Sequence, residues 1–147
     1  MAPVLNEKRF ESDIEDYLLT KGGYYRGEQQ FYLKGKAVDL SVMVAFISNT
    51  QHKEWERYKR TYLDDAEKML YKRFQEEVDS KGLVSVLRKG IKDRGITLRF
   101  AYFAPASALN PDLMDKYRQN ILMCHRQFAY SQDNHNTVDM VLTLNGI

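Results

Sequence analysis

Apolar side chains recur along most of this chain at the i, i+3 and i+4 spacing of amphipathic helices. The spacing predicts a first helix over residues 10–20, which ends at the glycines after Lys21. It then predicts four consecutive helical segments in the middle of the chain, over residues 39–49, 52–62, 65–82 and 83–91. A further turn or short helix is expected after Asn110, because Pro111 is favoured at the first position of a helix.

After Gly95 the apolar residues alternate with polar ones, which is the period of a half-buried strand. This alternation predicts strands over residues 96–103, 121–130 and 138–144. A run of helices followed by a run of strands is typical of the α+β class. We therefore expect one domain over residues 1–147, in which the helical middle packs on a small, mainly antiparallel sheet.

The last predicted strand carries a single acidic residue, Asp139. Strands disfavour aspartate by up to about 1 kcal/mol, and a buried carboxylate without a partner costs far more. Asp139 is therefore expected at a strand end, facing water, a cation or a metal. Asn145 and Gly146 follow the strand and form the pair that best suits a two-residue hairpin turn. Only Ile147 comes after this turn, so we expect the chain to be the front part of a larger protein.

The first predicted helix carries two further acidic candidates, Glu11 and Glu15. Its apolar side is predicted to be the buried face and consists of Phe10, Ile14, Tyr17 and Leu18. At 100° per residue Glu11 falls about 20° from Leu18 and Glu15 about 60° from it, so both carboxylates border that face. One interpretation is that they are first-turn acids, which the helix dipole stabilises by about 0.3 to 1 kcal/mol each. The other is that one of them is aimed at a metal site.

Composition and charge exclude several classes of function. The net charge of +2 permits a contact with nucleic acid without requiring one. Cys124 is the only cysteine, which excludes an intrachain disulfide and favours a cytoplasmic setting. The longest apolar run, residues 42–47, is far shorter than the about 18 residues of a membrane helix, so no membrane partner is expected. Lys36 lacks the flanking residues of a P-loop, and one cysteine with three scattered histidines gives no zinc spacing.

Two basic stretches of the helical middle are possible contacts for nucleic acid. The first consists of Trp55, Tyr58, Lys59 and Arg60, and the second of Arg88, Lys89, Lys92 and Arg94. The aromatic pair of the first stretch could stack on bases, although an aromatic pair at helical spacing is more often part of a core. The second stretch could contact phosphates, or it could be a solvated helix end that the helix dipole favours.

Several short motifs stand in a fixed order along the chain. They are Thr50-Gln51 with Trp55, residues 86–90 (VLRKG), residues 120–122 (NIL), Arg126-Gln127, Tyr130-Ser131, and Val138-Asp139 running to Asn145-Gly146. This ordered set resembles the N-terminal nuclease region of the restriction (R) subunit of type I restriction-modification enzymes. The resemblance runs from about Phe10 to the end of the chain.

The resemblance implies a PD-(D/E)xK nuclease site and an incomplete restriction-endonuclease-like core. Asp139 would be the first metal-binding acid, and Glu11 or Glu15 would assist it, with Glu11 favoured because it lies nearer the buried face. The Glu-x-Lys pair of the family is expected on the strand after Asn145-Gly146, beyond this chain, so residues 1–147 alone are not expected to cleave DNA.

The resemblance also implies a cofactor and partners. Mg²⁺ would serve the complete site, and ATP would serve only the full-length subunit, a type I site-specific deoxyribonuclease whose motor domains lie outside this chain. Duplex DNA would be the substrate, and the methylation and specificity subunits of the restriction complex would be partners. A competing hypothesis is a non-catalytic module whose helical middle binds DNA or a partner subunit.

Overall fold

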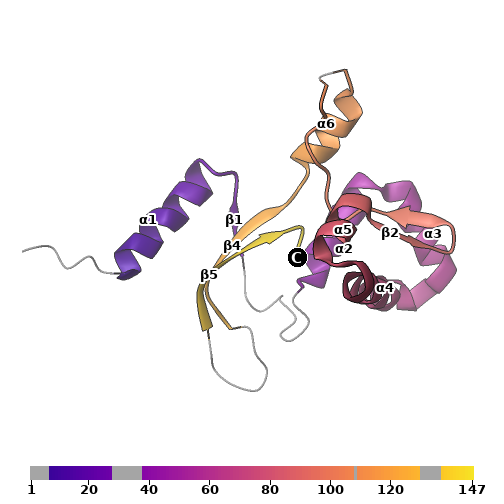
Figure 1. Cartoon of the computed structure of the whole chain (residues 1–147), viewed down its shortest axis with the longest axis horizontal. Helices are drawn as coiled ribbons and strands as arrows, with labels where there is room; N and C mark the ends of the chain where they lie inside the picture. The colour runs from indigo at the N-terminus through magenta and orange to yellow at the C-terminus, as the bar shows by residue number, and fades with distance from the viewer. Residues whose placement is uncertain (1–6, 28–37, 108, 130–136) are drawn as a thin grey trace, which may run out of the picture. The chain divides into compact units, whose positions relative to one another are not determined.

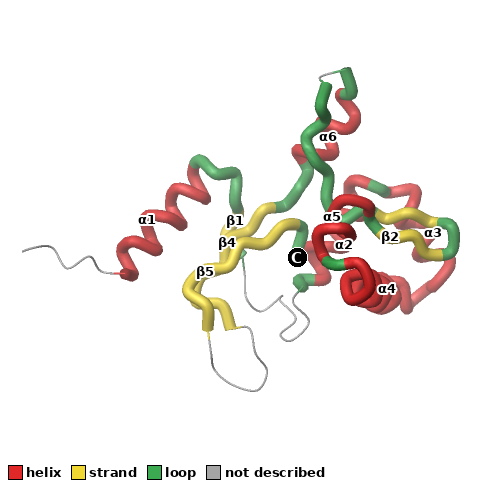
Figure 2. Tube along the Cα trace, viewed as in Figure 1, coloured by secondary structure: helices red, strands yellow, loops and turns green. Residues whose placement is uncertain are grey.

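The computed structural model describes residues 7–27, 38–107, 109–129 and 137–147 of the chain (Figure 1). The chain forms two compact units: unit 1 combines residues 1–39 with residues 121–147, and unit 2 is the continuous segment 40–120. Helices and short strands are both present (Figure 2), so the predicted α+β class is confirmed. Tyr130 and Ser131, which belong to a predicted strand and to one of the motifs, lie outside the described residues.

Unit 2 contains the four predicted middle helices, each close to its predicted bounds. They are α2 (Leu40–Thr50), α3 (His52–Tyr62), α4 (Ala66–Lys81) and α5 (Leu83–Lys89), with a 3₁₀ turn, η2 (Leu63–Asp65), between α3 and α4. A hairpin of β2 (Ile91–Asp93) and β3 (Ile96–Leu98) follows, and then α6 (Pro111–Arg118). The start of α6 confirms the predicted turn, because the Asn110 side chain caps it by accepting a hydrogen bond from the Leu113 N–H at 3.1 Å.

The β2–β3 hairpin corrects two predicted bounds. The helical spacing places Ile91 in the last middle helix, but α5 ends at Lys89 because Gly90 turns the chain with a φ of 71°. The next positive φ angles, 50° at Arg94 and 79° at Gly95, form a two-residue turn between the strands. The strand predicted over residues 96–103 ends at Leu98, since β2 offers only three residues for it to pair with.

Aromatic and aliphatic side chains form the core of unit 2. The rings of Trp55 and Tyr58 stack with centroids 5.7 Å apart, and those of Phe74 and Phe100 meet at 4.9 Å. Helices α3 and α4 contact the strands of the hairpin, so within unit 2 the middle helices pack on a two-stranded sheet. Full burial of a large apolar side chain stabilises a fold by about 1.5 to 3 kcal/mol, which makes this core the main source of stability in unit 2.

One carboxylate lies at the inner side of the hairpin and is held by tyrosines. Asp93 accepts hydrogen bonds from the hydroxyls of Tyr58 at 3.1 Å and Tyr62 at 2.7 Å, and Arg73 Nε lies 3.9 Å away. Burial raises the pKa of the Tyr58 hydroxyl, and its hydrogen bond to Asp93 raises it further. Both tyrosines therefore stay protonated at neutral pH and act as donors to the carboxylate.

Unit 1 is built on a three-stranded sheet with the order β1-β4-β5. The two long strands, β4 (Leu122–Ala129) and β5 (Thr137–Leu144), confirm two predicted strands and run antiparallel, with Cys124 opposite Leu142 and Arg126 opposite Met140. The short strand β1 (Tyr25–Arg26) pairs with β4 in parallel, so the sheet is mixed. Strands β1 and β5 are its two edges.

The predicted turn after β5 is confirmed in detail. Asn145 and Gly146 have φ angles of 53° and 84°, and the backbones of Leu144 and Ile147 exchange two hydrogen bonds of 3.0 Å across them. The Asn145 side chain is fully buried and accepts a hydrogen bond from the Ile121 N–H at 2.6 Å. Asn145 thus has two roles, because it tolerates the positive φ of the turn and its side chain links the turn to the start of β4.

Helix α1 (Glu7–Thr20) corrects the prediction of its buried face. Glu11 and Glu15 are each only 8% exposed, whereas Phe10 and Tyr17 are each 62% exposed. The reason is electrostatic, because the carboxylates of α1 meet arginine side chains from β1 and β4. The acidic face of the helix is therefore turned to the sheet, and the apolar spacing alone indicates the wrong side.

The central strand of unit 1 carries a buried histidine. His125 of β4 is 2% exposed, and its Nε2 lies 3.2 Å from the Thr143 hydroxyl of β5. Gly27, whose N–H donates to the Cys124 carbonyl at 2.9 Å, packs so closely on the imidazole that a Cβ there would collide with the ring. Burial lowers the pKa of His125, and the negative charge of Asp39 opposes this in part.

Among the described residues, the helices are all too short or too polar to cross a membrane.

Candidate functional site

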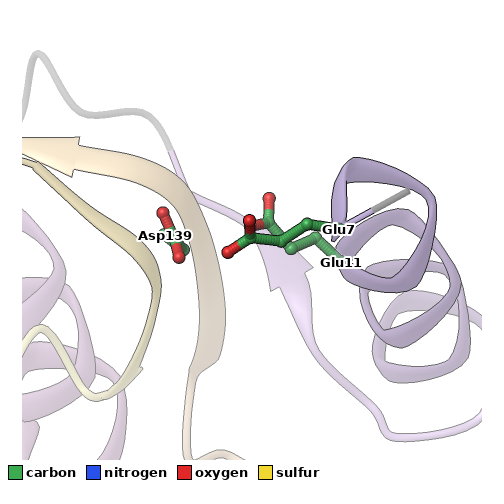
Figure 3. Close-up of side chains that lie close together, drawn as sticks. All are labelled: Glu7, Glu11 and Asp139. Carbon is green, nitrogen blue, oxygen red and sulfur yellow. The ribbon is translucent and has the colours of Figure 1, made fainter. Parts of the chain in front are cut away.

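Three carboxylates from two elements of unit 1 meet at one place. Glu7 and Glu11 belong to α1 and Asp139 to β5, and one oxygen of each lies within 4.8 Å of the other two. Figure 3 shows the two glutamates extending from the helix toward Asp139 on the strand. The structure therefore brings together two of the residues singled out from the sequence, Glu11 and Asp139, although they lie near opposite ends of the chain.

The local structure explains how this arrangement arises. Glu7 and Glu11 are four residues apart on a helix, so their side chains lie on the same face one turn from each other. Asp139 is the third residue of an edge strand and is exposed, as the sequence predicts for an acid near a strand end. Of the two glutamates only Glu11 is buried, so the three carboxylates extend from the buried face of α1 to the surface of the unit.

The spacing of the oxygens and their chemistry suit a hard divalent cation. Magnesium binds oxygen at about 2.0 to 2.1 Å and calcium at about 2.3 to 2.6 Å, so two ligands on opposite sides of one ion lie about 4 to 5 Å apart. The separation of up to 4.8 Å among the three carboxylates falls in this range. Exposed acidic groups are also common without an ion.

Arg126 of β4 holds the buried member of the group in place. Its Nη2 lies 2.9 Å from Glu11 Oε2, and its Nη1 donates to the Ser12 hydroxyl at 3.1 Å. The guanidinium is planar and its donors are fixed, so these contacts set the orientation of the Glu11 carboxylate.

Glu15, the alternative to Glu11, occupies a different position. It lies one turn further along α1, and its Oε1 is 3.3 Å from Arg26 Nη2 and 4.0 Å from Arg126 Nη1. These contacts tie α1 to β1 and β4. Glu15 therefore joins the helix to the sheet, whereas Glu11 is the glutamate of the pair that lies beside Asp139.

Sequence reasoning missed Glu7. The apolar spacing starts the first helix at Phe10, but α1 begins at Glu7, three residues earlier. Glu7 precedes Glu11 by four residues, so the two side chains lie on the same face of a helix. This i, i+4 relation was the sequence signal that could have identified Glu7. An acid in the first turn also suits the helix dipole, which accounts for the early start of the helix.

The aromatic residues of the first basic stretch have no part in base stacking. Trp55 and Tyr58 are 3% and 0% exposed, so the core interpretation is confirmed for both rings. Lys59 forms an ion pair with Glu56 of its own helix at 2.7 Å. Asp79 and Lys81 have the acid-x-lysine spacing of a nuclease site, but they lie at the end of α4, where Lys81 pairs with Glu77 at 2.9 Å.

No family model matches this chain, and comparisons with curated proteins and with solved structures also find no match.

Proposed function

We propose that this chain is the N-terminal part of the nuclease domain of a type I restriction R subunit, whose complete form cuts duplex DNA by metal-dependent phosphodiester hydrolysis. The proposal starts from the ordered motifs of the sequence. The single structural observation in its favour is that Asp139 and Glu11, chosen from the sequence for metal binding, lie together with Glu7 at oxygen separations that suit one ion. Duplex DNA, Mg²⁺ and the ATP-driven motor of the whole subunit enter through the family resemblance alone.

In this proposal each described residue has a separate task. The exposed Asp139 and Glu7 would contact the cation directly, and Glu11 would complete the site from its buried position. Arg126 would keep the Glu11 carboxylate from rotating away, because it donates a hydrogen bond of 2.9 Å to it. A bound divalent cation would neutralise charge on the scissile phosphate and lower the pKa of an attacking water.

The described residues do not contain the whole of a PD-(D/E)xK site. A PD-(D/E)xK site needs a lysine and a second acid two residues apart on one face of a strand. Asp79 and Lys81 have that spacing in sequence but lie on a helix, where residues two apart face different directions. Residues 1–147 alone are therefore expected to bind the cation without cleaving DNA.

Manganese binding by the 147-residue chain tests the metal site directly. Paramagnetic Mn²⁺ would be titrated by electron spin resonance into the unaltered chain and into Asp139→Asn. Loss of one of three carboxylate ligands is expected to weaken binding by about tenfold or more, in the range observed for changes around metal ligands. Asp13→Asn is the matched control, because Asp13 is exposed on the same helix outside the cluster. Equal affinities of the unaltered chain and Asp139→Asn would refute the site.

Iron can then show whether the bound metal faces DNA. Fe²⁺ replaces Mg²⁺ at many carboxylate sites, and with ascorbate and peroxide it releases hydroxyl radicals that cut only nearby DNA. A bound duplex should be cut in the presence of the unaltered chain and of Asp13→Asn, and left intact by Asp139→Asn. Cutting by all three proteins to the same extent would speak against a nuclease site at Asp139.

A further inference from the structure

We infer that unit 2 carries a separate binding site for the phosphate backbone of nucleic acid, on the outer side of the β2–β3 hairpin. The site is a surface hollow of about 270 Å³ lined by Gln51, Glu54, Thr97, Arg99, Tyr102 and Lys116. It lies entirely within unit 2, whereas the acidic cluster belongs to unit 1. The inference depends on the proposed function only in the choice of duplex DNA as the ligand.

Arg99 is the best-positioned cation of the hollow. Gln51, which is only 5% exposed, holds its backbone from both sides, donating to the Arg99 carbonyl at 2.9 Å and accepting from the Arg99 N–H at 2.7 Å. The guanidinium itself is exposed and reaches the end of α5, where Nη1 donates to the Arg88 carbonyl at 3.3 Å. A buried amide thus fixes the backbone of an exposed arginine, which lowers the entropy lost when the arginine binds an anion.

Lys116 of α6 supplies the second cation and shows which part of a nucleic acid would bind. Its ammonium lies 5.4 Å from the centroid of the Tyr102 ring, in a cation–π contact. Tyr102 is 8% exposed and has its ring against Phe46 at 6.0 Å, so the ring is packed inside the unit. Because the Tyr102 ring already packs against Phe46 and Lys116, it is not free to stack on a base. The hollow therefore presents charged and hydroxyl groups, which suit phosphates and not bases.

Further cations extend this site along the hairpin and the end of α5. Lys92 of β2 is paired with Thr97 of β3, and both side chains are exposed. Arg88 and Lys89 lie in the last turn of α5, next to the carbonyl that Arg99 contacts, and are also exposed. A row of cations longer than one small anion fits a chain of phosphates, and this is why we assign a nucleic-acid backbone to it.

Two carboxylates near the site do not cancel this charge. Glu54 lines the hollow together with two cations, Arg99 and Lys116. Asp93 of β2 faces the other side of the hairpin, where it accepts hydrogen bonds from Tyr58 and Tyr62. The outer side of the hairpin therefore keeps a positive balance, although the whole chain carries a net charge of only +2.

A salt titration of DNA binding tests the inference. The 147-residue chain and the double variant Arg99→Gln/Lys116→Gln would be titrated with a fluorescent duplex of random sequence, in EDTA so that no divalent cation contributes. Each phosphate contact adds about 0.9 to the slope of log K against log salt, so loss of two should reduce the slope by nearly 2. The affinity of the double variant at low salt should fall about tenfold or more.

The matched control is Lys68→Gln/Lys72→Gln, which removes the same charge from exposed positions of α4. The control should keep nearly the full slope. Equal losses of slope in the two double variants would mean that only the overall charge matters and would overturn the site. The absence of any duplex binding at low salt would overturn it as well.

Two further measurements separate this inference from neighbouring ones. Inorganic phosphate is compared with chloride at equal ionic strength, and selective displacement of DNA by phosphate would show a site for a small anion and refute the backbone assignment. Asp139→Asn should lose manganese but keep the full salt slope. Loss of the metal site with an intact slope, or the reverse, therefore distinguishes failure of the proposed function from failure of this inference.

Discussion

Helices α1 and α4 are both packed against sheet strands, one in each unit, but they bury opposite kinds of side chain. Helix α4 buries Ala66, Leu70 and Phe74, which is what its apolar spacing predicts. Helix α1 buries Glu11 and Glu15 and leaves most of its apolar side chains exposed. Apolar burial needs only area and shape, whereas a buried carboxylate needs one particular partner. The comparison shows that the packing of α1 depends on a few arginine side chains, whereas the packing of α4 depends on the whole apolar core of unit 2.

The largest expected loss of stability comes from removing an apolar core side chain of α4. Phe74→Ala should destabilise unit 2 by about 3 to 5 kcal/mol, because it leaves a cavity beside Phe100, whose ring lies 4.9 Å away. Urea unfolding followed by the fluorescence of Trp55, the single tryptophan, measures this. Val84→Ala, at a position 63% exposed, should change the stability by less than about 0.5 kcal/mol. Comparable losses in the two variants would contradict the assigned core.

A smaller loss of stability is expected when a charged contact of α1 is removed. Arg126→Met should destabilise the packing of α1 by about 1 to 3 kcal/mol, since it leaves the carboxylate of Glu11 buried without this donor while the site stays partly exposed. Hydrogen exchange of the α1 and β4 amides measures the loss. Adding Glu11→Gln to the variant should recover part of it, because a neutral amide is less costly to bury. If Arg126→Met leaves exchange unchanged, the charged contacts do not hold the helix.

The smallest expected effect is a dependence of the stability of unit 1 on pH near neutrality. Burial lowers the pKa of His125 below its usual value of 6.5, so the folded unit binds fewer protons than the unfolded chain. The stability of unit 1 should therefore be complete well above pH 6.5 and decrease as the pH falls through that value. His125→Gln should flatten this dependence, whereas His52→Gln, at an exposed position of α3, should not. An equally steep dependence in His125→Gln would assign it to another group.

The sequence predicts unit 2 better than unit 1 for a physical reason. The middle helices follow from the spacing of side chains such as Leu70 and Phe74, and this spacing is a local property. The buried face of α1 follows from Arg26 and Arg126, which come from strands far from the helix in sequence. Periodicity contains no information on such partners, so it indicates the wrong face.

The candidate site shows the same division. Asp139 could be recognised because an acid in an apolar strand is locally unusual, and Asn145-Gly146 because its turn chemistry is local. Glu7 was missed because its place in the site depends on where the helix begins and on the distant strand β5. The parallel pairing of β1 with β4 was also missed, since Tyr25 and Arg26 form too short a strand to show a period.

Position 27 connects the two outer strands of the unit 1 sheet through a single ring. Gly27 follows β1 and lies against His125, and the same imidazole contacts the Thr143 hydroxyl of β5. A methyl group added at position 27 would therefore displace the imidazole, and this displacement would alter the contact between the imidazole and the Thr143 hydroxyl. A change at one border of the sheet would be transmitted to the opposite border, which also carries Asp139.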